Sequence, residues 1–533
     1  RDGMDAVKGT GQDEIVVGVE LLETRCKGAI VDETTGLVDD EQSKDNPAGT
    51  VQAQALSTLS TIIGEAEGGV EQRQTNALRQ RQDEPANVGE IKELKTGSDL
   101  SLAVAHLEQD VSNLRCLIIG PPDTPYEFGL FEFKVKVGPA YPSQPPTVRC
   151  LTTNGGRCRF NPNIYACGKV CLSILGTWRG ERGEQWSIAQ GLESVLISIQ
   201  SLMSCNPYEN EPGFETTKIT DKEAGEYAQK IHHETLRITV LQRLEQLLQI
   251  NDDDHTTTVI ALDTAPADSD DDGVKEHHSP TDGKEDSTDL EFSPFTDLFK
   301  RRFLWYYDAY IKSIDNASTK VKDGKHFENA PFEYSSNEMR GKYAYASLRS
   351  RFERVCRALE AEKNTWSKNG KQLLTDQHGT AMNLQHQFDS LHSYYAASDG
   401  PSVEINLVDG NPFVWTLTFF GPYDTDLSGA IINVRLHFPF DFPEEQPRVT
   451  VLTPLFHHRI SPATKALCYF PNKLYDVQNH IESIIATIID ETPSYDPRAL
   501  VNPDASVLLW GDENCKKTYR RKLRRSVIDC DEL

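Results

Sequence analysis

The chain has 533 residues, which is enough for two to four domains of ordinary size. Its 81 acidic residues outnumber its 55 basic residues and give a net charge of -26. A chain of this charge repels phosphate backbones, so we expect no nucleic-acid partner. No apolar run approaches the ~20 residues that span a bilayer and no signal pattern opens the chain, so we expect no membrane partner.

The cysteine pattern argues against a metal site. Eleven cysteines are spread along the chain without a CxxC pair and without histidines at the spacing of a tetrahedral zinc site. We therefore expect reduced thiols in a soluble intracellular protein, cytoplasmic and in part nuclear, with no metal or organic cofactor. The first residue is Arg rather than Met, which suggests a fragment of a longer chain.

The N-terminal half begins with a segment of low apolar content. Residues 1–90 are rich in Gly, Gln, Glu and Thr and are predicted to form a flexible arm. Residues 91–250 are predicted to form a domain with a weakly marked first helix near 89–95. Periodicity in this domain predicts strands at 114–119 and 131–137 and helices at 188–203 and 223–248.

An acidic segment, 251–292, separates this domain from the rest of the chain. Residues 252–291 carry 14 acidic side chains against Lys275 and Lys284, which is typical of a solvated, disordered linker. Residues 293–370 follow as a helical extension with amphipathic helices at 295–314 and 343–366. We expect this extension to pack on the first domain.

The C-terminal segment, 380–533, repeats a pattern of the first domain. Gly421-Pro422-Tyr423-Asp424-Thr425 matches Gly120-Pro121-Pro122-Asp123-Thr124, and Pro443 and Pro447 match Pro142 and Pro146, each 301 residues apart. Strands are predicted near 413–420 and 430–438, before a basic terminal helix that is typical of a solvated surface. The repeat predicts a duplicated fold.

A short cysteine motif carries the chemistry of the first copy. Asn161-Pro162-Asn163 ends eight residues before Cys171, within a Gly-Lys-Val-Cys-Leu turn. With the Gly-Pro-Pro-Asp-Thr-Pro-Tyr block at 120–126 and the Tyr-Pro-Ser-Gln-Pro-Pro block at 141–146, this motif resembles the ubiquitin-conjugating enzymes. The resemblance implies an α/β (α+β) fold with two conjugating-type domains, each an antiparallel four-stranded sheet flanked by helices.

The same resemblance implies roles for Cys171 and Asn163. The cysteine would carry a modifier as a thioester, and the Asn163 amide would stabilise the oxyanion or hold the loop. Lys169 is the only Lys or His within three residues of Cys171, so the sequence shows no strong activation of the thiol. Exchange between two thiols of similar basicity does not need such activation. The family usually has His-Pro-Asn, and Asn161 replaces this His.

The loop after the long helix holds candidates for lysine activation. Family members place a carboxylate or small polar group there, and this chain offers Glu209, Asn210 and Glu211. A capped turn with solvated acids is an equally good interpretation. An enlarged loop at 176–187 and the segment 206–215 resemble the large Z-class conjugating enzymes.

One departure concerns the expected ligase-docking surface, which includes Ser143, Ile188 and Ala189. Common family members carry an aromatic residue where this chain has Ser143-Gln144. Loss of an aromatic anchor removes a typical binding hot spot, so we expect weak binding to ordinary RING-type ligases.

The second copy contains Cys468 but lacks the asparagine. One alignment places Arg459 at the position of Asn163, and an alignment counted back from Cys468 places Ile460 there. Arg459 with His457 or His458 could form a diverged site, so Cys468 is a second candidate thioester site, although we favour an inactive scaffold.

The sequence thus predicts a ubiquitin-conjugating enzyme, a cysteine thioester acyltransferase. Its expected partners are a ubiquitin-activating enzyme, ubiquitin or a ubiquitin-like modifier, a protein substrate and, for some reactions, a ubiquitin ligase. The alternative is a non-catalytic scaffold with two inactive ubiquitin-binding domains.

Overall fold

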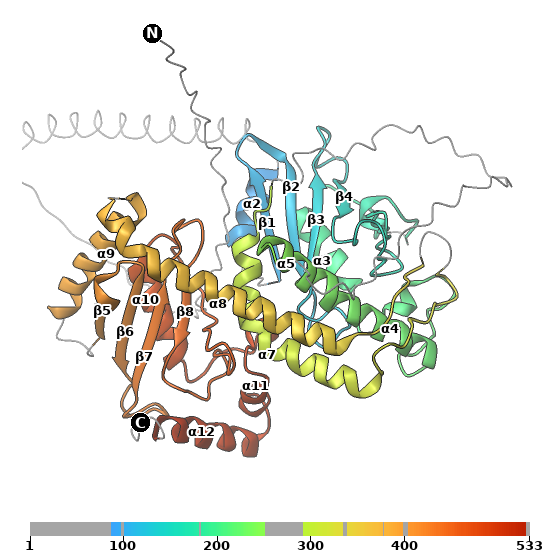
Figure 1. The fold of residues 1–533 in the computed structure, drawn as a ribbon. Helices are drawn as coiled ribbons and strands as arrows, with labels where there is room; N and C mark the ends of the chain where they lie inside the picture. The colour runs from blue at the N-terminus through green and yellow to red at the C-terminus, as the bar shows by residue number, and fades with distance from the viewer. Residues whose placement is uncertain are drawn as a thin grey trace, which may run out of the picture.

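The described part of the protein consists of two sheets joined by long helices (Figure 1). The computed structural model describes residues 87–96, 101–180, 183–250, 292–333, 338–376, 378–397 and 403–528. Most of the predicted arm and nearly all of the predicted acidic linker lie outside these ranges. Each sheet has four antiparallel strands in sequential order, which confirms the predicted fold.

The first domain holds the predicted helices and strands. Its elements are α2 (Asn87–Thr96), β1 (Leu102–Leu107), β2 (Asp110–Ile119), β3 (Leu130–Lys136), β4 (Thr147–Cys150), α3 (Leu192–Ser201), α4 (Lys222–Glu234), the π-helix η3 (Thr235–Gln242) and α5 (Arg243–Leu247). The predicted helix from 188 begins later than expected, at Leu192, because residues 187–190 form a turn in which the Gln190 N–H donates to the Ser187 carbonyl at 3.0 Å.

Both faces of the first sheet are buried. Phe131, Phe133 and Val135 of β3 point into a core that also contains residues of α3. Leu117 and Leu130 belong to a second core, which contains residues of η3, α5 and α7 (Thr296–Lys320). Successive side chains along a strand point to opposite faces of the sheet, so each strand contributes apolar residues to both cores.

The second domain has the same strand order and its own apolar core. Its elements are α9 (Gly379–Ala396), β5 (Val403–Leu407), β6 (Val414–Phe420), β7 (Ile431–His437), β8 (Arg448–Val451), α10 (Val477–Ile489), α11 (Pro503–Leu509) and α12 (Glu513–Ile528). The predicted strands correspond to β6 and β7, and the basic terminal helix is α12.

The two glycine turns show the duplication at atomic detail. The N–H groups of Gly120 and Gly421 donate to the carbonyls of Gly129 and Ala430 at 2.8 and 2.9 Å. A Cβ at either glycine would lie 1.8 Å from a backbone oxygen, so no larger residue fits. The peptide bonds before Pro142 and Pro443 are both cis.

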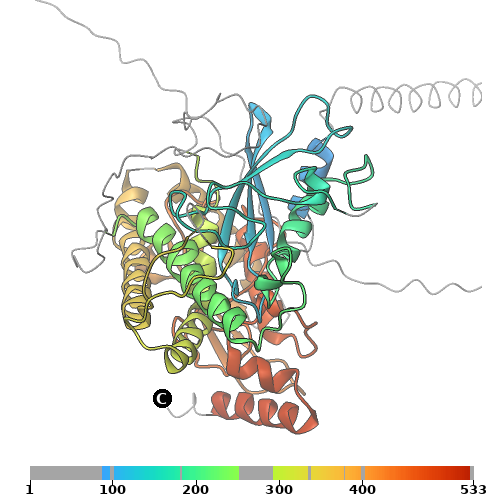
Figure 2. The same ribbon diagram turned by 90° about the vertical axis from the view of Figure 1, so that its right-hand side faces the viewer.

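The helical extension lies between the domains (Figures 1 and 2). It consists of α7 and α8 (Tyr345–Thr375). On one side of α7, the Tyr306 ring stacks on Phe128 with centroids 4.1 Å apart. Toward the second domain, the Tyr306 hydroxyl donates to the Arg498 carbonyl at 2.6 Å. The extension therefore packs on both domains, whereas we expected contact with the first alone. None of the described helices is long and apolar enough to cross a membrane.

Candidate active site

A tight turn brings Asn163 and Cys171 together. The Cys171 N–H donates to the Asn163 carbonyl at 2.8 Å, and Asn163 Nδ2 donates to the Cys171 carbonyl at 2.9 Å. Gly168 allows the turn with a φ of +89° and packs so closely on β4 that a Cβ would lie 2.5 Å from the Cys150 carbonyl oxygen. The cysteine and the asparagine are thus held by reciprocal hydrogen bonds.

Asn161, at the position of the family's usual histidine, supports this turn. Its side chain is fully buried. Nδ2 donates to the Leu202 carbonyl at 2.8 Å and to the Tyr126 hydroxyl at 3.1 Å, and Oδ1 accepts from the Asn163 N–H at 2.9 Å. Asn161 therefore links the turn to the end of α3 and to the loop between β2 and β3, which contains Tyr126.

The surroundings of Cys171 include a residue that the sequence analysis missed. Cys171 is only 4 % exposed, and the Tyr165 hydroxyl lies within hydrogen-bonding reach of its thiol. Burial raises the pKa of Tyr165, and the charge of the Cys171 thiolate raises that pKa further. Tyr165 stands two residues after Asn163 in the same turn, and this closeness to a predicted site residue was the signal available in the sequence.

The predicted lysine-activating loop is tied to the same turn. Asn210 Nδ2 donates to the Leu202 carbonyl at 3.0 Å. Glu211 pairs with Arg159 at 3.2 Å, and the Arg159 guanidinium lies over the Tyr165 ring, 4.7 Å from its centroid. Through Arg159 and Tyr165, Glu211 is thus connected to the cysteine.

Glu209 points elsewhere. Its carboxylate accepts from Asn206 Nδ2 at 3.3 Å. Asn206 immediately precedes the short 3-10 helix η2 (Pro207–Asn210), which contains Glu209. Of the three candidates, Asn210 and Glu211 therefore contact groups that hold the Cys171 turn, and Glu209 contacts its own loop.

The expected ligase-docking residues lie on two neighbouring loops. Trp186 Nε1 donates to the Pro142 carbonyl at 2.8 Å and joins the loop that carries Ser143 to the loop that carries Ile188 and Ala189. All three of these residues are exposed, and Ile188 is 74 % exposed. The structure therefore presents a small apolar surface without a large aromatic side chain at Ser143.

The second copy preserves the backbone of the site. The Cys468 N–H donates to the Arg459 carbonyl at 2.9 Å, as Cys171 does to Asn163. The Arg459 N–H donates to His457 Nδ1 at 3.1 Å, as Asn163 does to Asn161. The first of the two alignments is therefore correct, and Arg459 is the structural counterpart of Asn163.

The chemistry around Cys468 differs from that around Cys171. Cys468 is 0 % exposed and belongs to the apolar core that surrounds α7. Burial raises the pKa of its thiol, although Arg459 and Arg302 oppose this effect. Burial also lowers the pKa of His457 to about 3 and lowers that of His458, so both imidazoles are neutral.

The family model of the ubiquitin-conjugating enzymes matches residues 87–235 and 390–527, together more than half of the chain. The chain belongs to the ubiquitin-conjugating enzyme family. Both matched segments contain one sheet and one copy of the cysteine turn. Among the described residues, no cluster of His, Cys, Asp and Glu could hold a metal ion.

Curated relatives confirm the predicted Z-class resemblance. The chain is 37 % identical over 246 residues to ubiquitin-conjugating enzyme E2 Z of Xenopus tropicalis, which covers 46 % of this chain and 62 % of that protein. The human E2 Z is 52 % identical over 136 residues, 26 % of this chain and 37 % of that protein. This chain thus spans less than two thirds of either relative.

Two further matches are more limited. The human dual E2 ubiquitin-conjugating enzyme/E3 ubiquitin-protein ligase BIRC6 is 42 % identical over 156 residues, 28 % of this chain and 3 % of that protein. A solved E2 domain from Toxoplasma gondii is 26 % identical with a TM-score of 0.23, and the match covers 28 % of this chain and 95 % of that domain.

Proposed function

We propose that this chain accepts ubiquitin or a ubiquitin-like modifier on Cys171 and transfers it to a lysine. Cys171 Sγ attacks the carbonyl carbon that joins the modifier's C-terminal glycine to the activating enzyme, and the thiolate of that enzyme leaves. A lysine Nζ then attacks the same carbon, the Cys171 thiolate leaves, and the amine proton passes to solvent or to a nearby base.

The reciprocal hydrogen bonds between Asn163 and Cys171 carry this proposal. They hold the asparagine amide next to the cysteine, where an oxyanion would form, and one of its two N–H groups remains for that oxyanion. Tyr165 also lies beside the thiol and offers a hydroxyl to the entering lysine or to the thiolate.

The second domain acts as a scaffold in this proposal. Cys468 is buried in the core around α7, and Arg459 replaces the asparagine. A modifier could reach this sulfur only if the second domain separated from α7. The contacts of Tyr306 and Ser461 with partners across that boundary oppose such a separation.

The activating enzyme, a protein substrate and a ligase complete the proposed set of partners. The exposed Ile188 and the small Ser143 favour a weak contact with ordinary RING-type ligases. Tight binding of a standard RING domain would contradict this part of the proposal. We propose a cytoplasmic protein that also enters the nucleus.

A charging assay tests the assignment of the cysteine. The chain is incubated with activating enzyme, ATP and each candidate modifier, and adducts are separated with and without reductant. We expect a reductant-sensitive adduct with the unmodified chain and with Cys468→Ala, but not with Cys171→Ala. An adduct that needs Cys468 and survives Cys171→Ala would contradict the proposal, and no adduct with any modifier would support the non-catalytic alternative.

A further inference from the structure

The two domains carry a groove at the same place in the fold. In the first domain the groove lies between 146–149, the start of β4, and 167–177, the segment around Cys171. In the second domain it lies between 447–450 and 463–469, the matching segments around Cys468. The cavity volumes are about 300 and 320 Å³.

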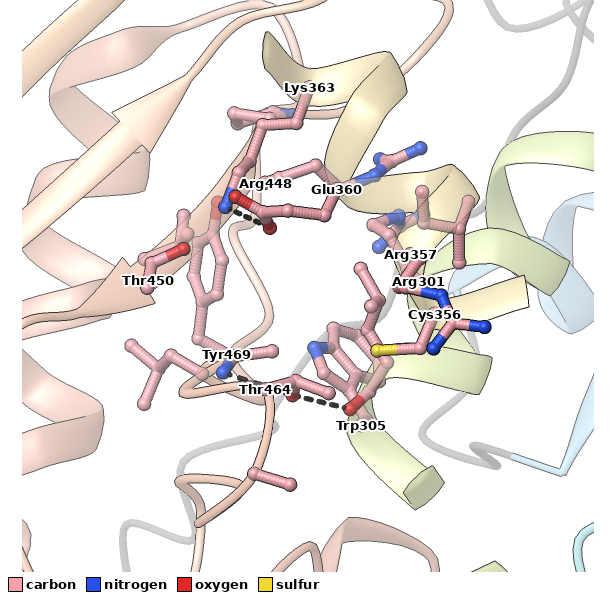
Figure 3. A pocket seen from close by; sticks show the side chains of 17 residues that line it. Arg301, Trp305, Cys356, Arg357, Glu360, Lys363, Arg448, Thr450, Thr464 and Tyr469 are labelled. Carbon is pink, nitrogen blue, oxygen red and sulfur yellow. Dashed lines mark hydrogen bonds and ion pairs between the residues drawn. The ribbon is translucent and has the colours of Figure 1, made fainter. Parts of the chain in front are cut away.

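Helices α7 and α8 cover the groove of the second domain (Figure 3). Leu304 and Trp305 of α7 line it, and Trp305 packs edge-on against Phe470 with centroids 5.7 Å apart. The Thr464 hydroxyl donates to the Leu304 carbonyl at 2.9 Å. One helical turn later, the Asp308 carboxylate accepts from the Ser461 hydroxyl and from the backbone N–H at position 463.

The groove of the first domain has no such cover within the described residues. Thr147 and Arg149 of β4 are exposed, whereas the matching residues of β8 are buried or half-buried. Cys167 and Lys169 on the other wall are also exposed. The groove is therefore open beside Cys171.

Charge distinguishes the two grooves. Arg149 and Lys169 stand on the first groove where Thr450 and Ala466 stand on the second. Neither Arg149 nor Lys169 forms an ion pair with a described residue. The open groove thus combines an apolar floor with a positive rim.

We propose that the open groove docks an acidic amphipathic helix of a protein substrate. The helix presents a bulky apolar pair to the groove, as α7 presents Leu304 and Trp305, and a carboxylate one turn later, as α7 presents Asp308. Additional carboxylates face Arg149 and Lys169. This inference rests on the proposed function, because a helix seated here brings a neighbouring lysine to Cys171.

A labelled peptide tests the docking without any modifier. The probe copies residues 296–312 of α7 with Arg301 and Arg302 replaced by glutamate, and binding to the full chain is measured by fluorescence anisotropy. We expect saturable binding that the double variant Arg149→Glu/Lys169→Glu weakens about tenfold, since like charges then face one another. The control variant Lys368→Glu/Lys371→Glu has the same net charge and should bind normally.

A second probe locates the bound peptide. It carries a photoreactive benzophenone side chain in place of Trp305, and mass spectrometry maps the crosslinks. Crosslinks within 146–149 or 167–177 support the inference. No binding, crosslinks elsewhere, or equal weakening by both double variants would overturn it. Because neither measurement requires a thioester, a failed charging assay with intact peptide binding would count against the proposed function alone.

Discussion

Replacement of Asn163 by alanine separates two roles of this side chain. Its Nδ2 donates one hydrogen to the Cys171 carbonyl at 2.9 Å and holds the turn. The second hydrogen is available to an oxyanion that forms on the carbon bound to Cys171. Asn163→Ala removes both donors, so its kinetic effects depend on which donor matters at each step.

The expected magnitudes of these roles differ. A single hydrogen bond that holds a loop contributes about 1 kcal/mol, or roughly a fivefold change in a rate that depends on the loop. Removal of an oxyanion donor costs about 2.7 to 4 kcal/mol, or roughly 100- to 1,000-fold. We expect charging of Cys171 to slow by the smaller factor and discharge to lysine to slow by the larger one.

Single-turnover assays measure the two steps separately. Charging is followed after mixing with loaded activating enzyme, and discharge is followed after charging is quenched and free lysine is added. Thr177→Val is the matched control, because the Thr177 hydroxyl donates to the Val170 carbonyl at 2.7 Å and holds the same turn away from the reacting carbon. This variant should slow both steps alike. Equal slowing of both steps by Asn163→Ala would refute the oxyanion role.

Three further predictions concern burial and charge. Asn161→Ala should destabilise the chain by about 2 to 4 kcal/mol in thermal or denaturant unfolding, because buried hydrogen-bond partners lose their bonds; an unchanged transition would contradict this. Iodoacetamide at pH 8 should label exposed Cys205 at least about tenfold faster than Cys468, whose pKa burial raises, as measured by mass spectrometry; equal rates would show that Cys468 is accessible. Burial opposes ionisation of Glu234, but Arg237 and His233 lower its pKa to about 2. The ionised Glu234 carboxylate therefore stabilises the fold fully above about pH 4.5. The free energy of unfolding should fall by about 2 to 3 kcal/mol as the pH drops toward 2. Glu234→Gln should reduce this pH dependence in unfolding experiments.

The sequence was sufficient to predict the two sheets and the pairing of Asn163 with Cys171. Both depend on local patterns, namely alternation along strands and a fixed spacing within one turn. The position of Arg459 could not be decided from the sequence, because the loop from Arg459 to Cys468 is one residue longer than the loop from Asn163 to Cys171. Two hydrogen bonds decide it, one from the Cys468 N–H to the Arg459 carbonyl and one from the Arg459 N–H to His457 Nδ1.

The placement of α7 was also beyond the sequence. An apolar stripe along a helix shows that one face is buried, but it does not show which part of the protein covers that face. Helix α7 carries aromatic residues on more than one face. Tyr306 stacks on Phe128 of the first domain, and Trp305 faces the second domain. The role of Tyr165 was missed because a single tyrosine in a turn is ambiguous until its neighbours are known.

The shared apolar layer around α7 makes the two halves of the chain mechanically dependent. Residues from the first sheet, from α7 and from the segment around Cys468 form one continuous core. Removal of the second domain would therefore uncover aromatic surface on a helix that supports the sheet beneath Cys171. The segment around Cys468 thus seats a helix that also supports the sheet of the first domain.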